Sequence, residues 1–328
     1  MIISRTPFRI SFVGGGTDLR VFYKKEFGQV LSTSINKYIY VAVKRQAEIV
    51  DFKYRINWSK VEFKNEIDEI EHPIVREALR MLNIDFPCEI TTFADIPAKS
   101  GLGSSSSFSV GLLNALYGLK GQMVSKKRLA EEAAKIEVEI LKRNMGKQDH
   151  YAAAFGGLNI ITFNSDETVS VEPVIKDSLS IKKLSDNLML FFTGSRFSRD
   201  ASKILKSQTE ATASKFGTLK AMRDLVPKLQ KSIELDNHDN FGRLLNDNWL
   251  LKKTITNNIS NKVIDDLYNK AIMEGALGGK LLGAGGGGFL CFYANQNVQE
   301  KIKKSLSELY NLDFNFENYG TQITYYDQ

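Results

Sequence analysis

The sequence contains few cysteines and no long apolar run. Only two of its 328 residues are cysteines, Cys88 and Cys291, which stand far apart in apolar, strand-like segments. We expect both to be buried free thiols. No apolar stretch reaches the length of a membrane-spanning helix, and the first seven residues lack the basic and apolar regions of a secretory signal. These absences predict a cytoplasmic protein that does not contact a membrane.

The features of a nucleic-acid-binding protein are also missing. The formal net charge is only +6, and no arginine-rich stripe is interleaved with aromatic residues. This charge is compatible with an anionic small molecule but predicts no nucleic-acid site. Hydrophobic residues make up 43% and charged residues 25% of the chain, as in ordinary globular proteins, and its length allows two domains.

Neither of the two commonest nucleotide motifs is present, although the chain has three glycine-rich segments. No glycine segment ends in the G-K-[ST] of a Walker A motif. Residues 14–18 follow a strand-like run but have Leu19 at the third glycine position of the dinucleotide fingerprint. Residues 283–288 match that fingerprint but lead into a strand-like segment rather than a helix. The three segments predict one site assembled between two domains, with three unrelated turns as the alternative.

The segment 95–107, D-I-P-A-K-S-G-L-G-S-S-S-S, is the most informative. It opens directly onto an apolar run at 108–116 that we expect to be helical. Glycine lets a backbone approach an anion closely, and the N–H groups and dipole at a helix N-terminus attract phosphate. Serine hydroxyls can cap a helix, bind phosphate or hold a cation. The pattern predicts a phosphate-binding loop, and a Ser/Gly linker before a helix is the alternative.

A helix predicted over 126–143 carries an acidic residue on its apolar side. With residues spaced about 100° apart around the axis, Glu137 falls between Ala133 and Leu141 in an apolar arc that also holds Ile140. A buried carboxylate without a partner is strongly unfavourable, so Glu137 needs a lysine or a bound cation. The alternatives are a structural ion pair and a half-exposed position.

Asp149 is expected in the loop just past that helix. One carboxylate that holds a metal and another that takes a proton suit phosphoryl transfer. Taken alone, Asp149 equally suits a helix cap or a turn.

Apolar periodicity predicts mixed strands and helices. Strands are predicted at 8–13, 37–43, 88–93, 157–163, 188–193, 289–293 and 322–326. Helices are predicted at 73–82, 105–119, 126–143, near 297–310 and through most of 200–275, with Gly217 and Pro227 as the main interruptions of the last region.

Together the three glycine segments resemble the motifs of the GHMP kinases, which include galactokinase, homoserine kinase, mevalonate kinase and phosphomevalonate kinase. The resemblance lies in residues 6–18, 96–107 and 280–288. Within the family the chain looks most like the D-glycero-D-manno-heptose 7-phosphate kinases. These share G-G-G-T-D at 14–18, a G-K-Q-D-x-Y-A-A-x-F-G-G motif similar to 146–157, and a T-G-x-x-R-x-A stretch similar to 193–201.

The resemblance implies an α+β fold of two domains with the site in the cleft between them. Residues 1–185 would form an ATP-binding domain of the ribosomal protein S5 domain 2 type, and residues 186–328 a helix-rich, ferredoxin-like domain. It implies ATP and Mg²⁺ as cofactors, a sugar or sugar phosphate as the acceptor, and a monomer or homodimer.

The resemblance also implies roles for individual residues. Asp149 would take the proton from the sugar hydroxyl, with Arg9 near the reacting groups, and Ser105 and Glu137 would hold Mg²⁺. The nucleotide would be bound by Lys99, Ser100, Gly101, Leu102, Gly103, Ser104, Ser105 and Ser106, with Ser107 at the end of the loop. The acceptor would be contacted by Gly15, Gly16, Thr17, Asp18, Gly286 and Gly287.

Two departures from the heptose kinase pattern are visible. His150 stands where glutamine is usual, and four serines occupy 104–107. We expect neither to touch the chemistry, and the first to alter acceptor contacts at most.

The function implied is ATP-dependent phosphorylation at the anomeric hydroxyl, converting D-glycero-D-manno-heptose 7-phosphate to the 1,7-bisphosphate. The distal phosphate needs a cationic pocket, for which Arg196, Arg199 and Lys203 are candidates, although a helix start with solvated basic residues fits them equally. The alternatives are galactose, fucose, mannose or mevalonate as the acceptor, or a non-catalytic sugar or nucleotide sensor on the same fold.

Overall fold

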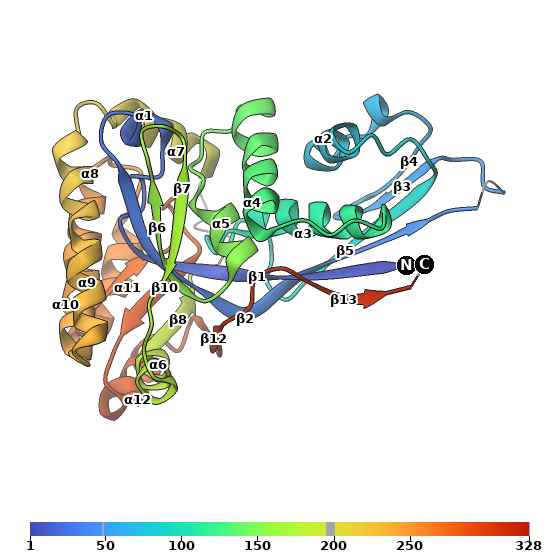
Figure 1. Ribbon diagram of the computed structural model, residues 1–328. Helices are drawn as coiled ribbons and strands as arrows, with labels where there is room; N and C mark the ends of the chain where they lie inside the picture. The colour runs from blue at the N-terminus through green and yellow to red at the C-terminus, as the bar shows by residue number, and fades with distance from the viewer. Residues whose placement is uncertain (48, 195–200, 328) are drawn as a thin grey trace.

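The computed structural model describes residues 1–47, 49–194 and 201–327, which form two lobes, each built on a sheet (Figure 1). The first lobe holds a nine-stranded sheet with the path β13-β1-β2-β5-β3-β4, to which β6, β7 and β12 are joined. Its strands are β1 (Ile2–Val13), β2 (Gly28–Arg45), β3 (Tyr54–Asn57), β4 (Val61–Lys64), β5 (Cys88–Ala94), β6 (Leu158–Phe163), β7 (Val169–Pro173), β12 (Phe316–Glu317) and β13 (Gln322–Tyr326). All pairs are antiparallel except β3 with β5.

Helix α3 (Ser104–Leu119) packs against β1 and β2, the two longest strands. Most of its side chains are buried, as expected of a helix that is apolar nearly all round. The other helical segments of this lobe are α1 (Arg20–Tyr23), η1 (Ile67–Glu69), α2 (Pro73–Met81), α4 (Lys126–Ala134), η2 (Lys135–Ile140) and α5 (Gln148–Phe155). Helix α6 (Ser178–Asp186) contacts the first strand of the second sheet instead and lies beside α12 in Figure 1.

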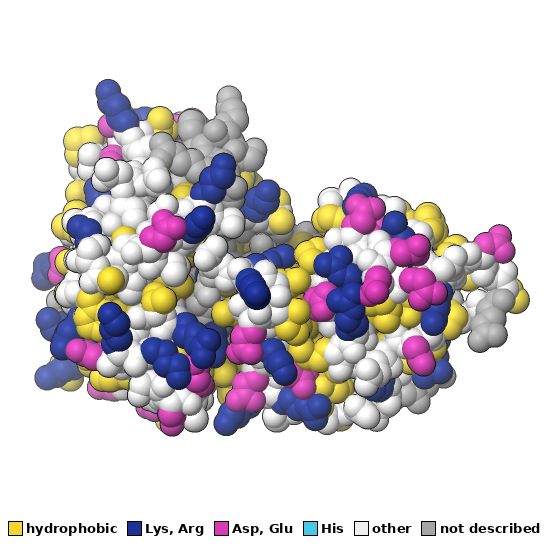
Figure 2. Space-filling view, turned by 90° about the horizontal axis from the view of Figure 1, so that it is seen from above, with side chains coloured by type: hydrophobic (Ala, Val, Ile, Leu, Met, Phe, Trp, Pro, Cys, Tyr) yellow, Lys and Arg dark blue, Asp and Glu magenta, His cyan; other side chains and the backbone are white. Residues whose placement is uncertain are grey.

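The second lobe has a four-stranded antiparallel sheet in the order β11-β8-β10-β9. Its strands are β8 (Leu188–Phe192), β9 (Gly278–Leu281), β10 (Phe289–Tyr293) and β11 (Tyr310–Leu312). Its helices are α7 (Ala201–Ala211), α8 (Phe216–Arg223), α9 (Leu225–Glu234), α10 (His238–Lys253), α11 (Lys262–Met273) and α12 (Gln296–Ser305). Mixed helix and antiparallel sheet confirm the α+β class. In the space-filling view the surface is hollowed between the two lobes (Figure 2).

The end of the chain returns to the first lobe. Strand β13 pairs with β1 and β12 pairs with β2, although both lie within the predicted C-terminal domain of residues 186–328. The two ends of the chain consequently lie side by side in Figure 1. The second sheet begins at Leu188, and the predicted boundary between 185 and 186 stays a prediction.

Three of the predicted helices differ from the structure. The helix expected over 126–143 is α-helical only to Ala134 and continues as the π-helical turn η2. Gly217 and Pro227 do not interrupt helices but stand in the first turns of α8 and α9, where the missing N–H of proline is not needed. The segment near 297–310 ends its helix at Ser305 and supplies strand β11 instead.

The structure bears on the predictions about the cysteines and about membrane-spanning helices. Cys88 and Cys291 are buried free thiols, and burial raises the pKa of both to about 12. Among the described residues no helix is long and apolar enough to cross a membrane.

Candidate functional site

The serine–glycine loop has the backbone of an anion-binding turn. Lys99, Gly101 and Gly103 have φ values of +64°, +86° and +80°, so left-handed residues alternate along the loop and can turn successive N–H groups toward one side. Helix α3 begins directly after it at Ser104, and the first N–H groups of a helix have no partner within it. The hydroxyls of Ser100 and Ser106 are buried without a hydrogen-bond partner among the described residues. Orphaned donors at a helix N-terminus fit a nucleotide phosphate.

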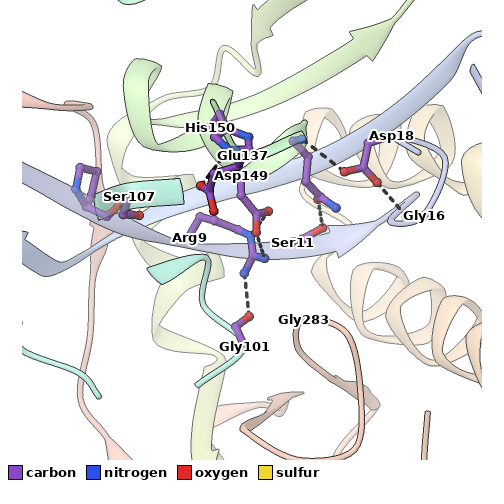
Figure 3. A network of polar contacts seen from close by, with 12 residues as sticks. Arg9, Ser11, Gly16, Asp18, Gly101, Ser107, Glu137, Asp149, His150 and Gly283 are labelled. Atoms are coloured by element: carbon purple, nitrogen blue, oxygen red, sulfur yellow. Dashed lines mark hydrogen bonds and ion pairs between the residues drawn. The ribbon is translucent and has the colours of Figure 1, made fainter. Parts of the chain in front are cut away.

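The third glycine segment packs directly on this loop. A Cβ added to Gly283 would lie 2.6 Å from the Cα of Gly101, and one added to Gly288 would lie 2.4 Å from the carbonyl oxygen of Ser100. No larger residue fits either position without moving the backbone. Figure 3 shows the loops of Gly101 and Gly283 facing each other. The predicted meeting of these two segments is therefore present in the structure.

Arg9 on β1 forms a two-pronged ion pair with Asp149. Its Nε lies 2.7 Å from Oδ1 and its Nη2 2.6 Å from Oδ2 of Asp149, while its Nη1 donates to the carbonyl oxygen of Gly101 at 2.7 Å (Figure 3). Such planar pairing fixes both the position and the rotation of the carboxylate. Asp149 lies in the first turn of α5, not in the loop before it. One guanidinium thus joins the predicted base to the phosphate loop.

Asp18 faces the same region from the first glycine segment (Figure 3). Its carboxylate accepts hydrogen bonds from the N–H of Gly16 at 3.0 Å and of Gln148 at 3.2 Å. Burial, and then the negative charge of Asp149, raise the pKa of Asp18 against the effect of these hydrogen bonds. A Cβ on Gly146 would overlap Asp18. Two carboxylates with different surroundings therefore share the cleft.

Glu137 is fully buried in the π-helical turn η2. One of its oxygens, Oε1, contacts Ser109 Oγ at 2.8 Å and His150 Nε2 at 3.1 Å. The other, Oε2, accepts from Ser105 and from Nη1 of Arg143. Burial alone would raise the pKa of Glu137, but these contacts outweigh it and lower that pKa to about 2. Ile140, expected in the same apolar arc, is instead exposed, because η2 does not keep the α-helical spacing.

His150 requires a correction. We expected this departure from the heptose kinase pattern not to touch the chemistry, but its ring contacts Glu137, a predicted metal ligand. Ser105, by contrast, was expected beside Glu137 as a second metal ligand, and its hydroxyl does contact that carboxylate. The contact of His150 was missed because nothing in the sequence pairs it with a residue 13 positions earlier.

The remaining predicted residues occupy varied places. Lys99 is exposed, and the carbonyl of the buried Leu102 accepts a hydrogen bond from the backbone of Arg9. The hydroxyls of Ser107 and Thr17 donate to the carbonyls of Pro7 and Gly14, so both side chains support the local fold.

The predicted acceptor and loop residues also differ in exposure. Partly exposed are Ser104, Gly15 and Gly287, whereas Gly286 is buried and its N–H donates to the carbonyl of Ile259. Arg196 and Arg199 lie outside the described residues, and Lys203 is exposed on α7.

Sequence reasoning missed two buried lysines from the second lobe. Lys280 Nζ donates to the carbonyls of Ser11 and Phe12 at 2.8 and 2.7 Å, which ties β9 to β1. Lys252 Nζ donates to the carbonyl of Gly283. Burial, and then the charge of Arg9, lower the pKa of Lys252 to about 8. Lys280 is the first residue of the third glycine motif, but nothing in the sequence connects it to β1, and Lys252 lies outside all three motifs.

The oxygen atoms near η2 fit Mg²⁺ only in part. Hard oxygen ligands such as the Ser105 hydroxyl and the Glu137 carboxylate suit this ion. Among the described residues no group of three or more histidine, cysteine or acidic side chains is placed to hold a metal. This donor set fits an ion that also relies on phosphate oxygens and water, as Mg²⁺ in kinases does.

Comparison with known proteins agrees with this geometry. The model of the GHMP kinases N terminal domain matches residues 73–157, and the model of the GHMP kinases C terminal domain matches residues 226–312. Together they cover just over half of the chain.

Relatives align over nearly the whole length. A D-glycero-alpha-D-manno-heptose 7-phosphate kinase from Campylobacter jejuni is 28% identical, with 98% of both chains covered. A galactokinase from Thermotoga maritima is 23% identical, with 95% of both covered.

Solved structures share the fold. A crystal structure described as a D-glycero-D-manno-heptose 1-phosphate kinase from Bacteroides thetaiotaomicron has a TM-score of 0.81 and 22% identity over all of both chains. Lactococcus lactis galactokinase complexed with galactose has a TM-score of 0.74 and 18% identity, over 98% of this chain and 94% of that one. With both family domains matched in order, the chain belongs to the GHMP kinase family and is an ATP-dependent phosphotransferase.

Proposed function

We propose that this kinase phosphorylates the anomeric hydroxyl of a sugar phosphate, D-glycero-D-manno-heptose 7-phosphate. The observation that carries the proposal is the contact of Arg9 with both Asp149 and Gly101. It holds a carboxylate at the N-terminus of α3, beside the loop whose N–H groups suit phosphate. Phosphoryl transfer to a hydroxyl needs a proton acceptor close to the bound phosphates. Arg9 supplies this arrangement, because it holds both Asp149 and the phosphate-binding loop.

Asp149 would accept the proton of the attacking hydroxyl. The oxygen of the acceptor forms a bond to the γ-phosphorus, the bond from that phosphorus to the bridging oxygen breaks, and its electron pair leaves with ADP. Because the transferred group is loosely bonded at the transition state, positioning matters more than base strength. A carboxylate already fixed by Arg9 meets that requirement, and Asp18 would bind other hydroxyls of the sugar.

Ser105 and Glu137 would hold Mg²⁺, with the nucleotide phosphates supplying further oxygens. When bound, this ion would neutralise negative charge that develops on the phosphates. The ionised state of Glu137 follows from its pKa of about 2. The N–H groups at 101–106 would supply the remaining stabilisation from the protein side.

A cluster of cations beside Asp18 supports an acceptor with a distal phosphate. Lys147 follows Gly146, which touches Asp18, and its Nζ lies 3.1 Å from Glu167. Arg20 and Lys24 pair with the same glutamate at 2.8 and 3.0 Å. Three cations share one carboxylate, so the cluster keeps a net positive charge that would attract a phosphate.

A panel of acceptors tests the proposal. We would incubate the protein, ATP and MgCl₂ with the heptose 7-phosphate, the unphosphorylated heptose, galactose, fucose, mannose and mevalonate, and follow ADP and the ³¹P spectrum. We expect turnover to be fastest with heptose 7-phosphate, with a new phosphorus signal coupled to the anomeric proton. Faster turnover of any other acceptor would reject the proposed substrate, and a product phosphorylated elsewhere would reject the proposed position.

A substitution of Lys147 tests the proposed contact with the distal phosphate. Lys147→Gln should raise KM for heptose 7-phosphate about tenfold, the loss expected of one charge-assisted contact, and leave KM for the unphosphorylated heptose unchanged. Lys301→Gln, which removes an exposed lysine on α12 away from the cleft, is the control.

A further inference from the structure

Arg143 holds the two oxygen atoms that the proposed Mg²⁺ site offers. Its Nη1 lies 2.5 Å from Glu137 Oε2 and 2.7 Å from Ser105 Oγ. The Ser105 hydroxyl itself donates to the same carboxylate oxygen. One guanidinium nitrogen thus contacts both proposed ligand oxygens, which also contact each other.

The contact has a clear electrostatic reason. Glu137 is fully buried, and a buried carboxylate without a countercharge is strongly unfavourable. Among the described residues, its ion-pair partners are Arg143 and His150. The side chain of Arg143 is 35% exposed, so its guanidinium reaches the carboxylate from the surface and has a path back to solvent.

The guanidinium and Mg²⁺ exclude each other from these atoms. Mg²⁺ takes near-octahedral ligands at about 2.0–2.1 Å. The Arg143 nitrogen, 2.5 Å from the Glu137 oxygen and 2.7 Å from the Ser105 oxygen, occupies the space that a metal ion bound to both oxygens would need. The positive charges of the two groups would also repel strongly at such short range, where little solvent screens them. One must leave before the other binds.

We propose that Arg143 is the resident counter-cation of the Ser105–Glu137 pair and that Mg²⁺ displaces it. The inference rests on the proposed function, because it takes Ser105 and Glu137 as the metal ligands. Arg143 acts here as a positioning residue: it keeps both oxygens together until the metal arrives.

The segment that carries Arg143 also reaches the acceptor side. Lys142 has a φ of +50°, an unfavourable backbone conformation for a residue other than glycine. Arg143 is held by a bond from its N–H to the carbonyl of Glu137 at 2.9 Å, and its own carbonyl accepts from Met145. The next residue, Gly146, abuts Asp18. The segment that carries Arg143 therefore connects the proposed metal ligand Glu137 to the proposed sugar ligand Asp18.

Metal binding without nucleotide tests the proposal. Mn²⁺ would be titrated into the protein and followed by water-proton relaxation, and melting temperatures would be recorded with EDTA and with MgCl₂. Arg143→Gln should bind Mn²⁺ about fivefold more tightly than the wild type, since a repelling charge is gone. It should melt lower in EDTA and gain more from MgCl₂ than the wild type does. Lys142→Gln removes an exposed charge from the same segment and should change neither quantity.

The possible outcomes separate the two proposals. A purely structural Arg143 would lower the melting temperature without tightening Mn²⁺ binding, and that result would overturn the inference. Glu137→Gln should abolish Mn²⁺ binding. If it does but Arg143→Gln does not tighten binding, only the displacement is wrong. If Glu137→Gln leaves Mn²⁺ binding unchanged, the proposed metal site and the displacement both fail.

Discussion

At the residue scale, the charged side chains of the cleft pair with residues that are distant in the sequence. Arg9 and Asp149 are 140 positions apart, yet they form one planar pair. Lys252 enters the same cleft from the second lobe, and among the described residues its one hydrogen-bond acceptor is the carbonyl of Gly283. A buried ammonium with so little compensation loses its proton more readily than an exposed one.

The pKa of Lys252 predicts a pH-dependent stability. Its folded value of about 8 lies below the ordinary 10.5, so between these values the unfolded chain binds more protons than the folded one. Stability rises with pH wherever that holds. We expect the unfolding free energy of the wild type to rise relative to that of Lys252→Met as the pH increases from 8 to 10.5.

Urea denaturation at a series of pH values measures this difference. Lys253→Met, a neighbouring lysine paired with Asp265, is the control. Parallel curves for the wild type and Lys252→Met would show that Lys252 is not held as a disfavoured cation.

The sequence predicts a residue of this site only where the residue type is unusual for its position or where the residue belongs to a motif. Glu137 stands out because a carboxylate is unexpected among apolar residues, and its burial bears out that reasoning. Arg143 follows it by six positions in the predicted helix, where the α-helical spacing places the two side chains about 120° apart around the axis. The sequence therefore does not predict their contact. His150 is visible as a departure from a pattern, but its contact with Glu137 depends on how α5 packs against η2.

At the element scale, close backbone packing joins the phosphate loop to the third glycine segment. The two approach so closely that Gly101 and Gly283 leave no room for a Cβ. Their contact determines the position of the loop relative to α10, since Lys252 on that helix holds the carbonyl of Gly283.

Substitution of Gly283 tests this packing. Gly283→Ala adds a methyl group 2.6 Å from the Cα of Gly101 at a left-handed φ of +73°, so the loop must shift. We expect ATP affinity to fall about tenfold or more, as a misplacement of about 1 Å can weaken catalysis a hundredfold. Gly217→Ala is the control because a Cβ there meets nothing within 4 Å, and it should leave ATP binding unchanged. Equal affinities in a calorimetric titration would contradict the proposed role of this contact.

The predicted helix over 126–143 shows where element prediction fails. Its capping serine, Ser125, and the periodicity to Ala134 are regular, and α4 forms there. Beyond Ala134 the buried contacts of Glu137 accompany a π-helical turn, which a fixed α-helical spacing does not anticipate. The strands at 289–293 and 322–326 were predicted with the observed limits. The first is a short, continuous apolar run that follows a glycine segment, and the second is rich in β-branched and aromatic residues.

At the scale of the whole molecule, the last strand braces the lobe that holds the proposed site. Thr321, the residue just before β13, donates its N–H to the carbonyl of Ala153 in α5, the helix whose first turn holds Asp149. Its hydroxyl contacts Thr6 on β1 at 2.8 Å and accepts from Asn114 on α3 at 3.1 Å. No local sequence pattern predicts this return, because strand pairing across more than 300 positions is a property of the complete fold.

Removal of that hydroxyl should destabilise the fold. Thr321→Val leaves the buried Thr6 hydroxyl without this partner, which should lower the unfolding free energy by about 1–3 kcal/mol. Thr324→Val, at an exposed position in β13, should have a much smaller effect. Chemical denaturation of both variants measures the difference, and equal losses would show that the hydroxyl network does not brace the lobe.

The most direct measurement of the whole account is the single-turnover rate of phosphoryl transfer in Asp149→Asn with ATP and the best acceptor bound. The account predicts a rate at least about 100-fold below that of the wild type, the usual contribution of a positioned general base, with ATP affinity unchanged. A near-wild-type rate in this variant would contradict the assignment of Asp149 as the group that takes the proton.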